Sequence, residues 1–592
     1  MALDLKRFLA RLPLFRGFGE EALLTLVGRS DLIQLDSGEL LYDQETEPDF
    51  LYLIISGRLR AEHYVAGEVE VRREIGRGES VGGMSILAGR PHKARVRAIR
   101  DTTVLGVPAQ AFEDLFDSQP AEGRRIVHKW LNRFFESSAE RRVRRSMGST
   151  RTVAVVPGHP GAPVEAVARG LSKALAEFNL TLRLDTNRLS QERGEGTDLR
   201  ALDGGEGLQL AYWLNDLEQR YRYLVFQGDR MDSAWTQRCL RQADRVLMVV
   251  DDRHALRPTE MTRILRQRKQ QSETEVVLVG RQPGQPMGWR DLSGSHLHHR
   301  IAQAEHTEYQ RLARMLTGRS LGLALGGGGA RGFAHIGMIR AMRELNLEPD
   351  LIVGTSMGGF IGALLATGMS TDDIRAATHD TWVKRNLLND YTVPRVSLIR
   401  AAKARRHMEA LFGQTRIEDL NRYYACVSTN LNRARIEVHD HGRLAHWVGT
   451  SMTVPGIAPP VVYKGDLLVD GGLLAPVPTD VLAAFGRGPV LASDVSSEEV
   501  FHGVEDSDAQ PKQAQRGTRG SQSMNIFQIL YRTATLSTPD EFRRRLINAD
   551  CYLRMPVDGI AMFDWDCFDK AVEDGYQHSR LKLEAWLRER GD

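Results

Sequence analysis

The sequence has little cysteine, no long apolar run and almost no excess of charge, and each shortage narrows what the protein can be. Its four cysteines are widely scattered, with no Cys-x-x-Cys pair, which favours free thiols in a reducing compartment. No run of about 18 or more apolar residues occurs, so we expect no membrane-spanning helix. The formal net charge is only +3, and a field this weak does not favour a nucleic-acid partner.

The beginning of the chain lacks a targeting pattern, and its length predicts several domains. Asp4, Lys6 and Arg7 interrupt the first apolar residues, so we expect no signal peptide and a cytoplasmic protein. With 592 residues, of which 42% are hydrophobic and 26% charged, the sequence is typical of a soluble chain with three or four domains. Composition and motifs place the domains at residues 1–145, 150–316 and 320–592.

The strongest local pattern opens the last of these domains. An apolar segment over 321–325 predicts a strand, a glycine-rich turn follows, and apolar residues at helical spacing then predict a helix. A second apolar strand over 351–353 turns sharply into another apolar helix. We therefore expect an α/β fold in which both special turns lie at the carboxyl ends of neighbouring parallel strands, where open sheets place their sites.

The two turns suit two parts of acyl-transfer chemistry. The pattern Gly354-x-Ser356-x-Gly358 indicates a nucleophile elbow, in which a strained strand-to-helix turn presents a serine oxygen. Backbone N–H groups of an oxyanion hole are expected from the other turn, Gly327-Gly328-Gly329-Ala330-Arg331-Gly332. A dinucleotide site shares this glycine pattern, but it needs an acidic residue closing the second strand, and none stands there.

A third motif lies further along the chain, where an apolar strand over 467–469 ends in Asp470-Gly471-Gly472. With this motif in place, the sequence resembles the patatin-like phospholipases. That family combines a Gly-Gly-Gly-x-Arg-Gly oxyanion loop, a Gly-x-Ser-x-Gly serine and an Asp-Gly-Gly or Asp-Gly-Ala aspartate. The resemblance implies that Ser356 and Asp470 form a catalytic dyad without histidine, and that Arg331 supports the loop.

The resemblance also implies a reaction and a substrate class. Asp470 would act as the base for Ser356, an acyl-enzyme would form, and water would then cleave it. The expected substrates are long-chain acyl esters, lysophospholipids or phospholipids, and no cofactor or metal is expected. Two alternatives stay open, a soluble carboxylesterase for short acyl esters and a catalytically silent membrane-docking or regulatory protein.

A Ser–Asp–His triad is the other catalytic arrangement that we considered. In α/β-hydrolases the histidine follows the aspartate, which leaves His502 and His578 as candidates. His502 opens a polar stretch over 502–523 that is typical of a mobile loop, and His578 falls in a polar terminal helix. Neither follows a strand with glycines, so the sequence favours the dyad.

Short alternating segments with turns between them fill the first domain and predict a small β-barrel or jelly roll. The segments YLIISGRLRA and GESVGGMSILAGRPHKARVRAI resemble a cyclic-nucleotide-binding domain. In that family a glutamate holds the ribose hydroxyl and an arginine holds the cyclic phosphate, and these positions fall on Gly83 and His92. The neighbouring Lys93 lacks the bidentate fork of arginine. We therefore expect a degenerate pocket with a docking or regulatory role, and no bound cyclic nucleotide.

The middle domain is predicted to be a second α/β unit, with strands over 152–156, 223–226, 245–250 and 276–279 and a helix over 164–178. Its glycine-rich turn over 157–161 lacks the Gly-Lys-Ser/Thr of a phosphate-binding loop. Asp251 and Asp252 follow a strand, where acidic residues are common in structural turns. The segment SAWTQRCLRQADRVLMVV resembles the region before the catalytic domain in neuropathy target esterase and its bacterial relatives, which implies a spacer or regulatory scaffold.

Two basic segments and a group of histidines have alternative interpretations. Arg141–Arg145 lies between the first two domains, and a helical, partly basic segment is expected over 371–413. We expect solvated surfaces there. The alternative is attraction to anionic lipid head groups, which would place the protein peripherally on the inner membrane face. His298, His299 and His306 lack tight metal-ligand spacing, so no metal site is expected.

Overall fold

The structure is a computed structural model that describes residues 2–12, 14–65, 68–128, 150–193, 213–214, 216–268, 273–282, 285–385, 387–496 and 545–590. The chain divides into two compact units, Met1–Gly318 and Arg319–Asp592, and each is described by itself. Among the described residues, no helix has the length and apolar character that a membrane crossing requires. Arg141–Arg145, the polar stretch over 502–523 with His502, and most of 524–548 lie outside the described residues.

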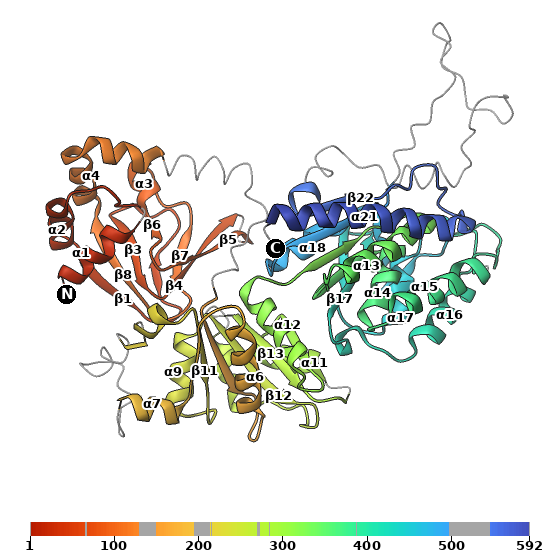
Figure 1. The fold of residues 1–592 in the computed structure, drawn as a ribbon, viewed down its shortest axis with the longest axis horizontal. Helices are drawn as coiled ribbons and strands as arrows, with labels where there is room; N and C mark the ends of the chain where they lie inside the picture. The colour runs from red at the N-terminus through yellow and green to blue at the C-terminus, as the bar shows by residue number, and fades with distance from the viewer. Residues whose placement is uncertain are drawn as a thin grey trace, which may run out of the picture. The chain divides into compact units, whose positions relative to one another are not determined.

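The first part of the first unit is a jelly roll of two four-stranded antiparallel sheets, ordered β1-β8-β3-β6 and β2-β7-β4-β5 (Figure 1). The strands are β1 (Asp31–Leu35), β2 (Leu40–Tyr42), β3 (Phe50–Ser56), β4 (Arg58–Val65), β5 (Glu68–Gly76), β6 (Ser80–Val81), β7 (Arg95–Ala98) and β8 (Thr102–Pro108). Helices α1 (Ala2–Arg11), α2 (Glu20–Gly28), α3 (Gly83–Ala88) and α4 (Ala109–Ser118) accompany them. The sequence predicts a helical stretch from 109 to about 138, and its described part is helical over 109–118 and again over 120–128. The break falls at Gln119, where Pro120 disfavours a helical conformation. Residues 129–138 lie outside the described residues.

The second part of this unit is a six-stranded parallel sheet, ordered β10-β11-β9-β12-β13-β14. Its strands are β9 (Thr152–Pro157), β10 (Thr181–Leu184), β11 (Tyr223–Gln227), β12 (Arg245–Asp251), β13 (Glu273–Val279) and β14 (Leu297–Ile301). Val153 and Val155 pack under α6 (Val164–Ala176) and α12 (His306–Thr317). Ala154 and Val156 face the opposite core, which holds residues of α9 (Ala234–Gln242) and α10 (Glu260–Gln267). Both faces of the sheet are therefore covered, as the apolar strands require.

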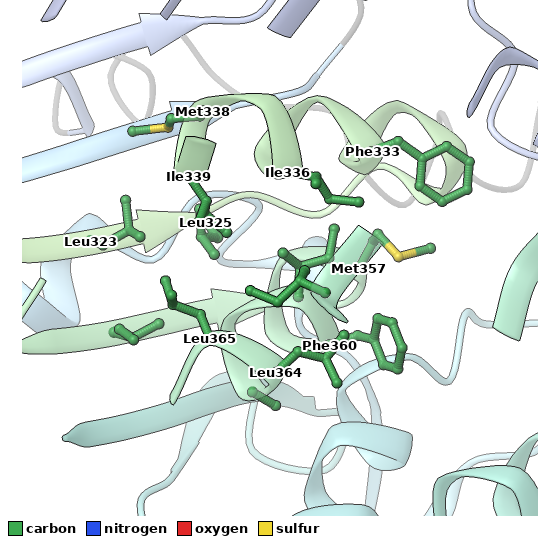
Figure 2. Packing of buried hydrophobic residues seen from close by; sticks show 14 of the residues in the cluster. Leu323, Leu325, Phe333, Ile336, Met338, Ile339, Met357, Phe360, Leu364 and Leu365 are labelled. Carbon is green, nitrogen blue, oxygen red and sulfur yellow. The ribbon is translucent and has the colours of Figure 1, made fainter. Parts of the chain in front are cut away.

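The second unit contains an eight-stranded mixed sheet, ordered β19-β20-β17-β16-β15-β21-β22, with β18 also paired to β17. The strands are β15 (Gly322–Leu325), β16 (Leu351–Thr355), β17 (Tyr423–Asn430), β18 (Arg435–His439), β19 (Val461–Tyr463), β20 (Asp466–Asp470), β21 (Val490–Asp494) and β22 (Cys551–Arg554). The central strands run parallel, whereas β18 and β20 run antiparallel to β17. Leu323 and Leu325 of β15 pack among side chains of α13 (Ala334–Glu344) and α14 (Met357–Ala366) (Figure 2).

The terminal helix α21 (Phe568–Arg590) packs against α13 so closely that the two backbones approach each other (Figure 1). A Cβ atom on Gly337 of α13 would overlap the Val572 carbonyl oxygen, and one on Gly575 of α21 would overlap the Ala334 carbonyl oxygen. Glycine on both helices therefore permits the close packing. Because α13 follows the glycine-rich turn directly, α21 helps to hold that turn in place.

The sequence predicted a helical segment over 371–413, but the structure interrupts it. Helix α15 (Thr371–His379) leads into a π-helical turn, Asp380–Lys384, and helix α16 (Ala402–Phe412) ends the segment. Between them the chain forms a hairpin in which Tyr391 pairs with Ile399. The sequence Thr392-Val393-Pro394 explains the difference, because β-branched residues favour extended backbone and proline breaks a helix interior.

Candidate active site

The two glycine-rich turns meet at one edge of the sheet in the second unit. Strands β15 and β16 are parallel neighbours, with Ala324 opposite Val353 and Leu325 opposite Gly354, so both chains leave the sheet side by side. A Cβ atom on Gly327 would lie 3.1 Å from the Ser356 Cβ atom. The glycine at that position therefore lets the backbone of the first turn approach the serine of the second.

Ser356 has the strained backbone of a nucleophile elbow. Its φ is +53° and its ψ is −121°, a conformation that side-chain-bearing residues rarely adopt. Cβ atoms on Gly354 and Gly358 would overlap the carbonyl oxygens of Gly358 and Leu325 respectively, so only glycine fits on either side. Ser356 is the N-cap residue of α14, and the helix N-terminus beside it favours developing negative charge.

Ser451 holds the elbow from an element that the sequence motifs did not include. The backbone N–H of Ser356 donates to the Ser451 Oγ atom at 3.0 Å. The Ser451 hydroxyl in turn donates to the Val427 carbonyl oxygen at 2.6 Å, which links α17 (Leu444–Ser451) to β17. No residue pattern around Ser451 indicates this role, because both of its partners are backbone groups distant in the sequence.

Asp470 ends β20 and lies in register with Ser428 of the neighbouring β17. Its Oδ1 atom accepts a hydrogen bond from the Gly472 N–H at 2.7 Å, and its own N–H donates to the Thr453 carbonyl oxygen. The Oδ2 atom is buried and has no hydrogen bond of good geometry within the described residues. One carboxyl oxygen is therefore fixed by the Asp-Gly-Gly turn, and the other is available to accept a proton.

The Asp470 carboxyl has the electrostatics of a general base. Burial raises its pKa to about 6, although the Ser356 hydroxyl and the Gly472 N–H both lower it by interacting with the carboxylate. Because the Ser356 hydroxyl affects the pKa of Asp470, the two side chains lie close enough to interact. A carboxyl with this pKa is ionised at neutral pH and yet basic enough to accept a proton.

Some backbone N–H groups of the glycine-rich turn hold the turn in place, and others form no hydrogen bond within the described residues. The N–H of Gly327 donates to the Pro476 carbonyl oxygen at 2.9 Å, and that of Ala330 donates to the Met562 carbonyl oxygen at 2.8 Å. The N–H groups of Gly328 and Gly329 make no hydrogen bond within the described part of the chain. These two, in the middle of the turn, are the donors that can meet an oxyanion.

Two buried side chains fix the turn from behind. The Arg331 Nε–H donates to the Ile560 carbonyl oxygen at 2.6 Å, which anchors the turn to the segment before α21. His335 Nε2 lies 2.8 Å from the Gly326 carbonyl oxygen, and its Nδ1 lies 2.8 Å from the Ser493 Oγ atom. Because a carbonyl only accepts, Nε2 carries the hydrogen and Nδ1 accepts from Ser493. Burial lowers the pKa of His335 to about 4, so the ring stays neutral in this bridge.

No histidine side chain hydrogen-bonds to Ser356 or Asp470 within the described residues. His578, one of the two triad candidates, lies on α21, and the other, His502, lies outside the described residues. His439 is bonded to the Ser428 Oγ atom and stacked on Trp447, and burial lowers its pKa to about 3. Among the described side chains, Asp470 is the carboxyl that interacts with Ser356.

Two of the three histidines considered for a metal site pair with carboxylates. His299, on β14, bonds to Glu275, and His306 at the start of α12 bonds to Glu177. The described residues contain no group of three or more His, Cys, Asp or Glu side chains that could hold a metal ion. Asp252 accepts the backbone N–H of Gln282, which is a structural contact between loops.

The two positions predicted for the degenerate nucleotide pocket are occupied by structural interactions. Gly83 begins the short helix α3 and is buried. His92 is 3% exposed, and its ring stacks on Tyr42 with 3.8 Å between ring centroids. Burial lowers the pKa of His92, so the ring is neutral where the resemblance would place the phosphate-binding arginine. These residues offer neither the carboxylate nor the guanidinium that the family uses.

Comparison with known proteins identifies three domains in this chain. Residues 323–483 match the patatin-like phospholipase family, residues 149–289 match the Neuropathy Target Esterase family P-loop like domain, and residues 32–119 match the cyclic nucleotide-binding domain. The resemblances drawn from the motifs are thereby confirmed. The predicted order of a jelly roll, a middle α/β unit and a C-terminal patatin-like α/β domain is confirmed with them.

Curated relatives match almost the whole chain but are themselves longer. Patatin-like phospholipase domain-containing protein 7 of Mus musculus is 29% identical over 94% of this chain and 45% of its own length. Lysophospholipase NTE1 of Phaeosphaeria nodorum is 28% identical over 94% of this chain and 42% of its own length. The chain thus spans less than half the length of these relatives. Among solved structures, the regulatory domain of Toxoplasma gondii PKA with cAMP is 22% identical, at a TM-score of 0.20, over 23% of this chain and 51% of its own.

The residues at the two predicted ligand positions, Gly83 and the buried His92, predict that the jelly roll does not bind cyclic nucleotides. A ligand present at 100 times its dissociation constant would stabilise its domain by about 2.7 kcal/mol. We expect neither cyclic AMP nor cyclic GMP to shift the thermal unfolding of the full chain beyond the shift with 5′-AMP, the control nucleotide. A saturable shift that only the cyclic nucleotides produce would contradict this interpretation of His92 and Gly83.

The raised pKa of Asp470 predicts how the reactivity of Ser356 depends on pH. A fluorophosphonate probe labels an activated serine, and only the deprotonated carboxyl can act as base. We expect the labelling rate to level off above pH about 6 and to fall about tenfold per pH unit below it. The variant Asp470→Asn should label slowly at every pH. Wild-type labelling that stays constant from about pH 8 down to about pH 5 would exclude Asp470 as the base.

The bridge through Ser451 predicts that its hydroxyl positions the nucleophile. In Ser451→Ala the Ser356 N–H loses its buried acceptor, at a cost of about 1–3 kcal/mol. We expect fluorophosphonate labelling to slow by about tenfold or more, with the pH midpoint unchanged because Asp470 is untouched. Ser579→Ala is the matched control, since Ser579 is also fully buried but its hydroxyl hydrogen-bonds only to the Met555 sulfur atom within the described residues. Equal labelling of both variants would show that Ser451 has no positioning role.

Proposed function

We propose that this protein is a serine esterase that hydrolyses acyl ester bonds of lysophospholipids or phospholipids through a Ser356–Asp470 dyad. The observation that carries the proposal is the strained Ser356 beside a buried Asp470 with a raised pKa, next to two free backbone N–H groups. These are the nucleophile, the base and the oxyanion donors that acyl transfer requires. The names of the curated relatives, a patatin-like phospholipase domain protein and a lysophospholipase, support the lipid substrate class.

In the proposed reaction, the Asp470 carboxylate removes the Ser356 hydroxyl proton as Oγ attacks the ester carbonyl carbon. The N–H groups of Gly328 and Gly329, with the N-terminus of α14, stabilise the tetrahedral oxyanion. The intermediate collapses to an acyl-serine, and the leaving alcohol takes the proton from Asp470. Water then attacks the acyl carbonyl carbon while Asp470 accepts a proton from the water. The Ser356 Oγ atom takes this proton from Asp470 as its bond to the acyl carbon breaks, and the fatty acid leaves.

The surrounding residues support this scheme by holding groups in place. Arg331 and His335 fix the oxyanion loop through the carbonyl oxygens of Ile560 and Gly326, and neither side chain needs to exchange a proton. Ser451 fixes the backbone of the nucleophile. Catalysis by oriented dipoles depends on such rigidity, because donors that must first reorganise lose most of their advantage.

The proposal extends to the organisation of the chain. Residues 1–145 would form a regulatory or docking domain, residues 150–316 a scaffold, and residues 320–592 the catalytic domain. The jelly roll keeps the fold of a cyclic-nucleotide-binding domain, but the positions of Gly83 and His92 do not favour the ligand. We further place the protein in the cytoplasm, peripherally at the inner membrane face, where its lipid substrates lie.

The test is fatty-acid release from lysophosphatidylcholine by the purified full chain in the presence of a chelator. We expect wild type to be active without calcium. Ser356→Ala should lose about 10⁴-fold or more of the rate, because it removes the nucleophile. Asp470→Asn should lose about 10²–10⁴-fold, because it removes the general base. Ser579→Ala, the buried-serine control, should keep the wild-type rate.

Three other results would point elsewhere. Preference for short, soluble acyl esters over lysophospholipid would favour the carboxylesterase alternative. Near-normal activity of Asp470→Asn would assign the base to another residue. A wild-type chain that labels with fluorophosphonate at no measurable rate and hydrolyses neither class of ester would favour the silent docking alternative.

A further inference from the structure

A hairpin over residues 390–400 projects from the catalytic unit between the π-helical turn and α16. Its two arms pair through the bridge between Tyr391 and Ile399, and the Thr392 N–H donates to the Leu398 carbonyl oxygen at 2.9 Å. The Arg400 N–H closes the base by donating to the Asp390 carbonyl oxygen. The hairpin is held by these bonds and by the Leu398 and Ile399 N–H groups, which donate to the Ile457 carbonyl oxygen, and residues 393–396 form its tip.

The hairpin exposes three large apolar side chains, one on its first arm and two at its tip. Tyr391, Val393 and Val396 are 72%, 74% and 70% exposed. No other large apolar side chain among the described residues of the catalytic unit exceeds 69% exposure. Three such side chains lie within six residues of one short hairpin. A local concentration of exposed apolar side chains is typical of a surface that binds a partner.

The sequence around the hairpin is strongly basic. Seven basic residues and one acidic residue stand between positions 384 and 406. The acidic residue, Asp390, is engaged by the backbone N–H groups of Ala402 and Lys403 at the start of α16. Arg395 at the tip and Arg400 at the base are exposed and form no ion pair within the described residues. Apolar side chains flanked by free guanidinium groups suit an anionic lipid surface, which offers hydrocarbon below a layer of phosphate.

The base of the hairpin is continuous with the candidate active site. Ile399 is buried in a small apolar cluster with Val454, Ile457 and Ala458, and Met562 packs against this cluster. Thr453, one residue before the cluster, accepts the backbone N–H of Asp470, and Met562 accepts that of Ala330 in the oxyanion loop. The hairpin thus stands on segments that hold both the base and the oxyanion loop.

We propose that the 390–400 hairpin is the docking element through which the catalytic unit binds an anionic phospholipid surface. Tyr391, Val393 and Val396 enter the interfacial layer, and the surrounding basic side chains contact lipid phosphates. The mouth of the site is then held against the layer from which an acyl ester must be drawn. This inference rests on the proposed function for its purpose, but the binding that it describes does not require hydrolysis.

The binding test uses the full chain with Ser356→Ala, so that no lipid is consumed. Co-sedimentation is measured with vesicles of phosphatidylcholine alone and of phosphatidylcholine with phosphatidylglycerol. We expect binding to the anionic vesicles to be stronger and to fall by about tenfold or more when Tyr391→Ser, Val393→Ser and Val396→Ser are combined. The pair Arg395→Gln and Arg400→Gln should lose roughly fivefold per charge on anionic vesicles only, in a salt-dependent manner.

The matched control is Leu581→Ser on α21, since Leu581 is 69% exposed but lies outside the hairpin and its basic surroundings. It should bind vesicles as the parent chain does. A second form of the triple hairpin variant keeps Ser356. Its rate of fluorophosphonate labelling without vesicles checks that the variant is folded. Hydrolysis of vesicle-borne lysophospholipid by this variant should fall in proportion to binding, while hydrolysis of a soluble short-chain ester stays near that of wild type.

Two outcomes would overturn the inference. One is vesicle binding that the triple hairpin variant leaves unchanged. The other is an oligomer of the parent chain that dissociates in the triple variant without any change in vesicle binding, which would assign the hairpin to contacts between copies of the chain. If vesicle binding depends on the hairpin but wild type releases no fatty acid, the docking inference stands and the proposed function fails.

Discussion

The catalytic unit depends on the close approach of two backbone turns at the carboxyl ends of β15 and β16. The parallel register that places Leu325 opposite Gly354 brings the chains out side by side, and the turns then touch without intervening side chains. A side chain on Gly354 or Gly358 would overlap neighbouring carbonyl groups. The strained backbone of Ser356 lies between β16 and α14, and the bond from its N–H to Ser451 helps to hold it there.

Burial then gives the aspartate its chemistry. Burying an isolated carboxylate costs free energy. For Asp470, the hydrogen bond from the Gly472 N–H offsets part of this cost, and burial raises its pKa to about 6. The supporting polar groups are also buried, but they are paired, as in the Ser451 and His335 bridges. The site therefore combines fully bonded supports with a few groups left free for substrate, namely Asp470 Oδ2 and the N–H groups of Gly328 and Gly329.

The jelly roll shows that a fold and its ligand chemistry are separable. The two antiparallel sheets and the family match are retained, but the ribose and phosphate positions hold Gly83 and a neutral His92 stacked on Tyr42. Packing of apolar strand residues maintains the fold, whereas ligand binding needs particular charged groups that packing does not require. A domain of this kind can therefore keep its fold without the charged residues that bind the ligand.

The motifs predicted Ser356 through the steric need for glycine on either side of it, whereas the role predicted for Asp470 came from the family resemblance. Many strands were also predictable from apolar runs, but the sequence analysis missed short strands such as β10 and β14. Only the tertiary structure decided that the Gly327 N–H is used by Pro476 and that Ser451 holds the nucleophile, since these bonds join backbone groups far apart in sequence. It also decided that the basic segment contains a hairpin between two helices and that Tyr391, Val393 and Val396 are exposed, because exposure depends on what packs nearby and not on residue type.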